Sequence, residues 1–249
     1  MFETLSLSEP RNDVYRLRLE RRSRLNAINE QMIEDLQAAT DRLAAEDPDA
    51  VVLAGAGSRS FSIGMDTRAP IARRDDQTAG ESVARQAQEV MDAIESLSAP
   101  VMAAVDGLAL GGGLELALTA DVRIGGESSE YGLPEITHGL IPGAGATQRL
   151  PAIVGRGRAY EMMFTGEKYD AEEMADWGLL AAVVPDDEVV DAALDRAEEL
   201  AGADAGSDED GERVLAPGAG RVSEGFMLEQ SGLGQAFSRD PFDAASDDD

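Results

Sequence analysis

Residues 103–115 read Ala-Ala-Val-Asp-Gly-Leu-Ala-Leu-Gly-Gly-Gly-Leu-Glu, an apolar run that leads into three glycines and a carboxylate. The apolar residues Val101 to Val105 predict a buried strand. The glycine triplet, residues 111–113, lets the backbone approach a ligand closely. The helix expected from about Gly111 to Leu118 begins with free N–H groups that favour negative charge. An oxyanion site is built in this way, and a tight turn without a ligand is the alternative interpretation of the triplet.

Two glutamates near this segment are candidates for proton transfer. Glu115 lies in an otherwise apolar helix, so we expect its carboxylate to be buried. Because burial of an unpaired charge is costly, it must be paired, protonated or functional, and a glutamate satisfied by the helix dipole is the alternative. Glu135 follows Pro134, 20 residues further along, in a stretch whose prolines and glycines predict a fixed backbone.

Strand and helix signals alternate on both sides of the triplet. Val14 to Glu20 alternates apolar and polar residues as a half-buried strand does, and Asn29 is suited to cap a helix over about residues 30–45. Further signals predict strands at residues 51–53 and 122–124, and helices at about 77–97, 146–150 and 155–164. An α/β fold follows, with one catalytic domain over residues 1–201.

Residues 202–249 differ in composition from the rest of the chain. They are acidic and rich in glycine, so we expect a divergent C-terminal segment that is partly disordered or irregularly helical.

Composition excludes several classes of protein. The 249-residue chain has no cysteine and a single histidine, His138, which excludes thiolate chemistry and cysteine zinc sites and argues against a catalytic triad. We interpret His138 as a structural or surface residue. There is neither a basic leader nor a run of 18 apolar residues, so we expect a cytoplasmic protein without a membrane partner.

The charge is strongly one-sided. Against 21 basic residues stand 49 acidic ones, which gives a formal net charge of −28. Nucleic acid is therefore a poor candidate partner. Such a surface repels itself in dilute salt, whereas molar salt shortens the Debye length to about 3 Å, so the charge predicts a halophilic protein. An ordinary acidic protein is the alternative.

Three motifs together resemble the enoyl-CoA hydratase/isomerase, or crotonase, superfamily over about residues 26–184. Residues 61–66 read Phe-Ser-Ile-Gly-Met-Asp, where the family has a Gly-x-Asp loop after Phe-Ser. The segment at 103–117 matches the family's Ala-Ala-Val-x-Gly-x-Ala-x-Gly-Gly-Gly-x-Glu-Leu-Ala. Residues 132–135 read Gly-Leu-Pro-Glu and are followed by Pro-Gly-Ala-Gly at 142–145 and Gln-Arg-Leu at 148–150. Their order and spacing are those of the family.

The resemblance implies a fold, a reaction and roles for named residues. The fold is a spiral of ββα repeats with a C-terminal helical region, usually assembled as a homotrimer or hexamer. The reaction is reversible syn addition of water to a 2-enoyl-CoA, giving a 3-hydroxyacyl-CoA, as in fatty-acid metabolism and β-oxidation. The backbone N–H groups of Met65 and Gly112 would hold the thioester oxygen. Glu115 would activate water and Glu135 would protonate C2. Neither a metal nor a separate cofactor is needed, since coenzyme A is part of the substrate.

The coenzyme A portion has its own candidate residues. Arg59 and Arg68 flank the Gly-Met-Asp loop and are expected to meet the phosphates, with scattered surface arginines as the alternative. The resemblance also points to backbone contacts along both glycine-bearing turns, from Ser62, Ile63, Gly64, Met65, Asp66, Gly111 and Gly112. Asp66 is expected to brace its own loop.

Two other functions remain open. A Δ3,Δ2-enoyl-CoA isomerase of the same superfamily needs one carboxylate, typically at the Glu135 position, so the presence of Glu115 favours hydration. A non-catalytic acyl-CoA-binding paralogue is the other alternative, because the family's closing helices are not recognisable after Gly202.

Overall fold

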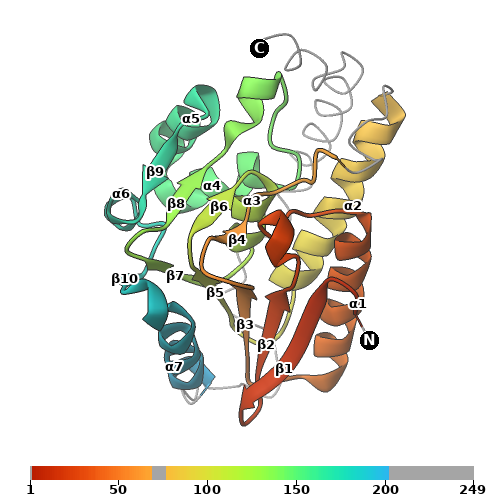
Figure 1. The fold of residues 1–249 in the computed structure, drawn as a ribbon, viewed down its shortest axis with the longest axis vertical. Coiled ribbons are helices and arrows are strands. Elements are labelled where there is room, and N and C mark those ends of the chain that lie inside the picture. Colours follow the sequence, from red (N-terminus) through yellow and green to blue (C-terminus); the bar gives the residue numbers. More distant parts are fainter. Residues whose placement is uncertain (1, 69–76, 202–249) are drawn as a thin grey trace.

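The computed structural model of the protein describes residues 2–68 and 77–201, in which strands and helices alternate (Figure 1). The strands are β1 (Leu5–Arg11), β2 (Val14–Leu19), β3 (Ala50–Gly55), β4 (Ser60–Ser62), β5 (Val101–Val105), β6 (Leu108–Leu110), β7 (Val122–Gly126), β8 (Glu130–Gly132), β9 (Lys168–Asp170) and β10 (Ala182–Val184). The α-helices are α1 (Glu30–Glu46), α2 (Gln77–Glu95), α3 (Gly112–Leu118), α4 (Ala146–Val154), α5 (Arg156–Thr165), α6 (Ala171–Asp176) and α7 (Val189–Ala201). Short 3-10 helices are η1 (Arg22–Arg24), η3 (Pro134–His138) and η4 (Asp186–Glu188).

The strands form two sheets. The larger has the order β1-β2-β3-β5-β7-β10, and the smaller has the order β4-β6-β8-β9. Pairing is parallel from β2 to β10, with Leu53 opposite Ala103, whereas β1 and β9 run antiparallel to their neighbours. Successive strands therefore alternate between the sheets, since β3, β5 and β7 join the large sheet and β4, β6 and β8 join the small one. This confirms the predicted α/β spiral of strand, strand and helix.

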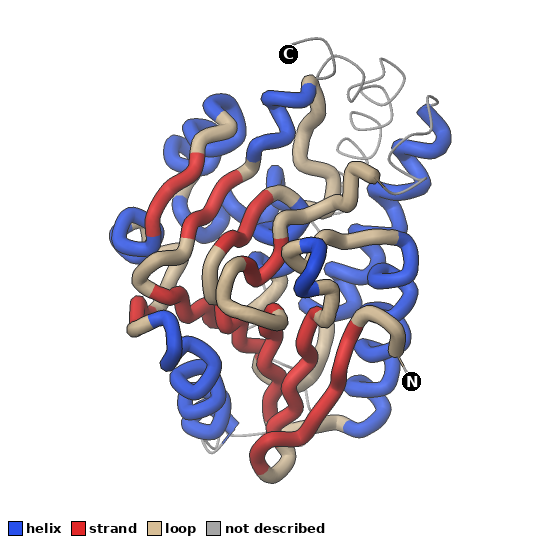
Figure 2. The backbone as a smooth tube through the Cα atoms, in the orientation of Figure 1, coloured by secondary structure: helices blue, strands red, loops and turns tan. Residues whose placement is uncertain are grey.

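Alternation of side chains divides the core into two layers on the large sheet. In β3, Val51 and Leu53 belong to the layer that also holds buried residues of α1 and α2, whereas Val52 and Ala54 belong to the layer of α7. A strand exposes successive side chains to opposite faces, and both faces of this sheet are covered by helices. Figure 2 shows α7 on the opposite side of the large sheet from α1 and α2. The continuous apolar strands in the sequence follow from this double burial.

Most predicted elements are present, with small shifts at their ends. The strand expected at 101–105 has those bounds, and the helix expected at 30–45 ends one residue later. Its cap is also confirmed, because Asn29 Oδ1 accepts a hydrogen bond from Met32 N at 3.1 Å. The glycine- and proline-rich stretch before Gly145 contains β8 and η3, which were not predicted. Also missed were strands β1, β4, β6, β9 and β10 and helices α6 and α7.

Two expectations concern chain segments rather than elements. The predicted C-terminal segment 202–249, including its irregular helices, lies outside the described residues. Within the part that is described, no helix combines the length and apolar character needed to cross a bilayer.

Candidate active site

A cavity of about 170 Å³ lies where the beginning of α3, helix η3 and helices α1 and α2 meet. Apolar side chains of α1 and α2 line one side of it, among them Leu36, Val90 and Met91. The glycines at the start of α3 and the polar residues Glu115 and Glu135 also line it. Both predicted glutamates therefore open onto one mainly apolar cavity.

The two predicted oxyanion donors lie beside one another. Met65 forms a parallel β-bridge with Ile28, in which Ile28 N donates to Gly64 O at 2.7 Å and Asp66 N donates to Ile28 O at 2.8 Å. In such a bridge the N–H of Met65 itself points away from Ile28. Gly112 is the first residue of α3, where N–H groups have no partner within the helix. A Cβ built on Gly112 would be 3.8 Å from Met65 N, so the two amides adjoin.

Close approach of the two turns requires glycine. Gly64 has φ of +81°, and a Cβ there would lie 2.7 Å from Gly112 N and 2.8 Å from Leu110 O. Any side chain at Gly64 would therefore separate the two amides. The glycines in both motifs are explained by this contact between two backbones that are far apart in sequence.

Glu115 is buried, as the sequence predicted, with 3% of its surface exposed. Its Oε1 accepts hydrogen bonds from Ala144 N at 2.8 Å and Ala146 N at 3.0 Å. Burial raises the pKa of this carboxyl, and the amides, together with the nearby Arg149 guanidinium, act against that rise. A carboxyl with a raised pKa in an apolar cavity is suited to exchange protons near neutral pH.

Glu135, in the Gly-Leu-Pro-Glu motif, lines the same cavity. It follows Pro134 at the beginning of η3, and its backbone carbonyl accepts a hydrogen bond from Leu140 N at 3.0 Å. Its side chain lies against the backbone of Gly111, because a Cβ there would be 2.8 Å from Glu135 Oε1. Gly111 has φ of +52°. The first glycine of the triplet thus makes room for this carboxylate.

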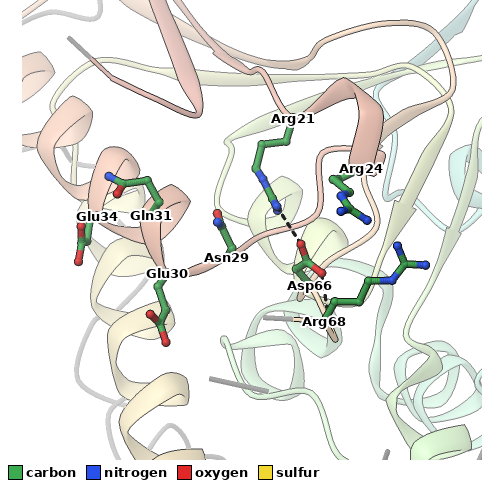
Figure 3. Close-up of a pocket in the computed structure, with 8 residues that line it drawn as sticks. All are labelled: Arg21, Arg24, Asn29, Glu30, Gln31, Glu34, Asp66 and Arg68. Atoms are coloured by element: carbon green, nitrogen blue, oxygen red, sulfur yellow. Dashed lines mark hydrogen bonds and ion pairs between the residues drawn. The ribbon is translucent and has the colours of Figure 1, made fainter. Parts of the chain in front are cut away.

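A second, polar cavity of about 400 Å³ adjoins the first and shares Asn29 with it. Figure 3 shows Arg21, Arg24 and Arg68 grouped around Asp66 on one side of it, with acidic residues of α1 on the other. Arg21 Nη2 lies 2.8 Å from Asp66 Oδ2, and Arg68 N donates to Asp66 Oδ1 at 3.1 Å. Asp66 therefore braces its loop, as predicted.

The structure brings together only some of the predicted coenzyme A contacts. Arg68 and Asp66 line the polar cavity, and Ile63 and Met65 line the apolar one. Arg59 is exposed and lines neither of these two cavities. Ser62 is buried, and its hydroxyl donates to Asn26 O at 2.8 Å, so it braces the turn internally.

Two residues of interest did not emerge from the sequence. Arg21 and Arg24 line the polar cavity, although neither was among the candidate residues named from the sequence. Three arginines within four residues on so acidic a chain are the signal that was available. His138 is exposed, as expected, but it lies at the wall of the apolar cavity.

Among residues 2–68 and 77–201, no group of three or more histidine or carboxylate side chains is placed to hold a metal ion.

Fold and site together define an α/β protein with paired carboxylates beside two converging backbone amides. Residues 9–208 match the family model described as "Enoyl-CoA hydratase/isomerase". The chain belongs to the enoyl-CoA hydratase/isomerase family. YngF of Bacillus subtilis (strain 168) is 39% identical over 186 residues, which are 74% of this chain and 69% of that protein. The Mycobacterium avium (strain 104) relative echA17 is matched over 65% of its length, so the chain spans just under two thirds of that protein.

Solved structures agree in fold. An enoyl-CoA hydratase from Bacillus anthracis has a TM-score of 0.76 and 36% identity, covering 80% of this chain and 77% of that one. A monofunctional enoyl-CoA isomerase from M. smegmatis has a TM-score of 0.67 and 32% identity, covering 80% and 85% respectively. Hydratases and isomerases therefore both occur among the structural relatives.

Proposed function

We propose that this chain is an enoyl-CoA hydratase, which adds water across the 2,3-double bond of an acyl-CoA thioester. The observation that supports this most is the shared cavity, in which Glu115 and Glu135 lie beside the amides of Met65 and Gly112. Hydration needs a base for the water and an acid for C2, so two carboxyl groups in one cavity suit it better than one. The family relationship supplies the acyl-CoA substrate class.

In the proposed mechanism the two amides bind the thioester oxygen and stabilise the negative charge that develops on it. Such a donor contributes about 2.7 to 4 kcal/mol to lowering the barrier. Glu115 deprotonates the water that attacks C3, while Glu135 delivers a proton to C2. Their proximity in an apolar cavity favours a single shared proton, because simultaneous ionisation is penalised. Atoms and electrons balance with substrate and water alone, so we propose no separate cofactor.

The polar cavity is the proposed place for the phosphates of coenzyme A. It offers Arg24 and Arg68 beside the loop that also carries the Met65 amide. Local positive charge matters here because the chain as a whole has a formal charge of −28. We further propose a cytoplasmic location and assembly as a homotrimer or hexamer. Sedimentation of the full chain in concentrated KCl checks the oligomeric state.

The test is turnover of crotonyl-CoA in molar KCl by the native protein and by Glu115→Gln. Without the general base, kcat should fall by about 10² to 10⁴-fold, while KM changes little because the substitution preserves shape. Glu127→Gln, at an exposed glutamate outside the cavity, is the matched control and should keep native kcat. A native kcat for crotonyl-CoA hydration in Glu115→Gln would contradict the assigned role of general base.

The alternative function is double-bond isomerisation, which the M. smegmatis isomerase among the structural relatives supports. That reaction moves one proton and needs only one carboxylate. If the chain converts a 3-enoyl-CoA to the 2-enoyl-CoA and Glu135→Gln alone abolishes turnover, the isomerase reading holds. Loss of activity in both glutamate variants favours hydration.

A further inference from the structure

Arg149, on α4, is a buried arginine close to the proposed site that the mechanism above does not use. Its side chain is 5% exposed, and all three guanidinium nitrogens have partners. Nε donates to Glu95 Oε2 at 2.9 Å, and Nη2 donates to Asp92 Oδ1 at 2.6 Å. Nη1 donates to the backbone oxygen of Ala144 at 2.9 Å. One guanidinium therefore ties α2 to the loop before α4.

That loop is the one that supports Glu115. Ala144 presents its carbonyl to Arg149 and its N–H to Glu115 Oε1, so one residue is held from both sides. The loop has a second tie to α2, because Gln88 Nε2 donates to Gly143 O at 3.0 Å. Displacement of Arg149 would free the carbonyl of Ala144 and, with it, the amide that fixes the carboxylate.

We propose that Arg149 is a positioning residue for hydration: through its ties to Ala144, Asp92 and Glu95 it holds the amides that orient Glu115 and brings a positive charge near that carboxylate. The inference rests on the proposed role of Glu115 as the base that activates water. Arg149 lines neither of the two cavities, so it would act through other groups rather than on the substrate.

The charges around Glu115 set the direction of the effect. Arg149 lowers the pKa of Glu115 against the effect of burial. Asp92 and Glu95 partly compensate the positive charge of Arg149, and Glu135 and His138 are the other titratable groups at the same cavity. Removal of the Arg149 charge should therefore raise the pKa of Glu115. Because the base must be ionised, the acid limb of kcat against pH then moves to higher pH.

Charge and geometry can be separated by two substitutions. Arg149→Met removes both, so kcat should fall by about 10²-fold, as misplacement of a catalytic group by about 1 Å can cause, and the acid limb should move up. Arg149→Lys keeps the charge but loses the planar fork, so kcat should fall while the limb stays near its native position.

A third variant tests for a shift of the acid limb in the opposite direction. In the double variant Asp92→Asn, Glu95→Gln the acceptors for Arg149 remain, but the compensating charges are gone, so the acid limb should move to lower pH. This variant keeps the proposal testable if Arg149→Met fails to fold. The control is Glu89→Gln, an exposed glutamate of α2, which should leave the limb in place.

A purely structural role predicts a different pattern. Arg123 is another buried arginine that binds backbone carbonyls, including Leu179 O at 2.9 Å. Arg123→Lys should lower the unfolding midpoint without moving the limb. If Arg149→Met and the double variant also leave the acid limb unmoved, the inference is wrong, even when loss of activity in Glu115→Gln upholds the base. If the native protein hydrates no enoyl-CoA, the proposed function fails first.

Discussion

At the scale of single residues, the site depends on backbone positions as much as on side chains. The Met65 and Gly112 amides adjoin because residue 64 has no side chain. Gly64→Ala would place a methyl group 2.7 Å from Gly112 N, at a φ of +81° that alanine tolerates poorly. The substitution should therefore act on the oxyanion site while every ionisable group remains in place.

We expect Gly64→Ala to lower kcat for crotonyl-CoA by about 10² to 10³-fold, the loss associated with one oxyanion donor. Steady-state kinetics at saturating substrate measures it. Gly157→Ala is the control, since this glycine of α5 has no atom within 4 Å of its built Cβ. The control should keep kcat and gain up to about 1 kcal/mol in free energy of unfolding. If Gly64→Ala kept the native kcat, the oxyanion site would not depend on this turn.

The residues that the sequence predicted well are those whose motif is local. Glu115 was expected to be buried because its helix neighbours are apolar, and only 3% of its surface is exposed. Arg24 was missed because its place beside Asp66 and Arg68 depends on how η1 folds against a loop some 40 residues away. Arg149 was quoted only as part of a motif, because its partners on α2 lie 54 and 57 positions away. Ion pairs between residues that are far apart in the sequence produce no periodic pattern in it.

At the scale of elements, the other long helices and the longer buried strands were predicted, whereas helix α7 and the short strands were not. Helix α1 shows a cap and an amphipathic pattern, whereas β4, β6, β8 and β9 have three residues each, too few for a period of two. Strand β1 was missed for another reason, since its pairing with β2 and its contact with α1 are tertiary.

One carboxylate joins the residues just before β1 to α1. Asp35 Oδ2 accepts hydrogen bonds from Thr4 N at 2.7 Å, Thr4 Oγ1 at 2.7 Å and Glu3 N at 2.9 Å. Burial acts to raise the pKa of Asp35, but these donors outweigh it and the pKa lies below its usual value. A lowered folded pKa means that the stabilisation is complete above the unfolded pKa, about 3.9, and is lost as pH falls through the folded value.

We therefore expect Asp35→Asn to cost about 1 to 3 kcal/mol of free energy of unfolding at pH 7. The difference from the native protein should shrink as the pH is lowered below about 4. Urea unfolding at constant KCl over a range of pH measures both. Asp41→Asn, at an exposed position of the same helix, should change stability by no more than about 0.5 kcal/mol. A pH-independent difference would mean that Asp35 acts through packing alone.

At the scale of the whole molecule, net charge is the dominant feature. The sequence carries 49 acidic and 21 basic residues, and the salt bridges of the described part, such as Arg11 with Asp195 and Glu198, compensate only some of them. We propose that the protein is adapted to concentrated salt. Repulsion among surface carboxylates reaches about 10 Å at 0.1 M salt and about 3 Å at 1 M, so salt should stabilise the compact state.

The measurement is the thermal unfolding midpoint between 0.1 and 2 M KCl, which we expect to rise with salt concentration. If salt acted on the hydration of the protein surface rather than by screening charges, it would stabilise every variant equally. The control variant therefore changes the charge alone. Substitution of Glu127, Asp187, Glu188 and Asp191 by their amides changes the formal net charge from −28 to −24, and all four are exposed. The slope of the midpoint against the logarithm of KCl concentration should be smaller in this variant, because fewer like charges remain to be screened. Equal slopes would assign the salt dependence to hydration, and a native midpoint that does not respond to KCl would refute the adaptation itself.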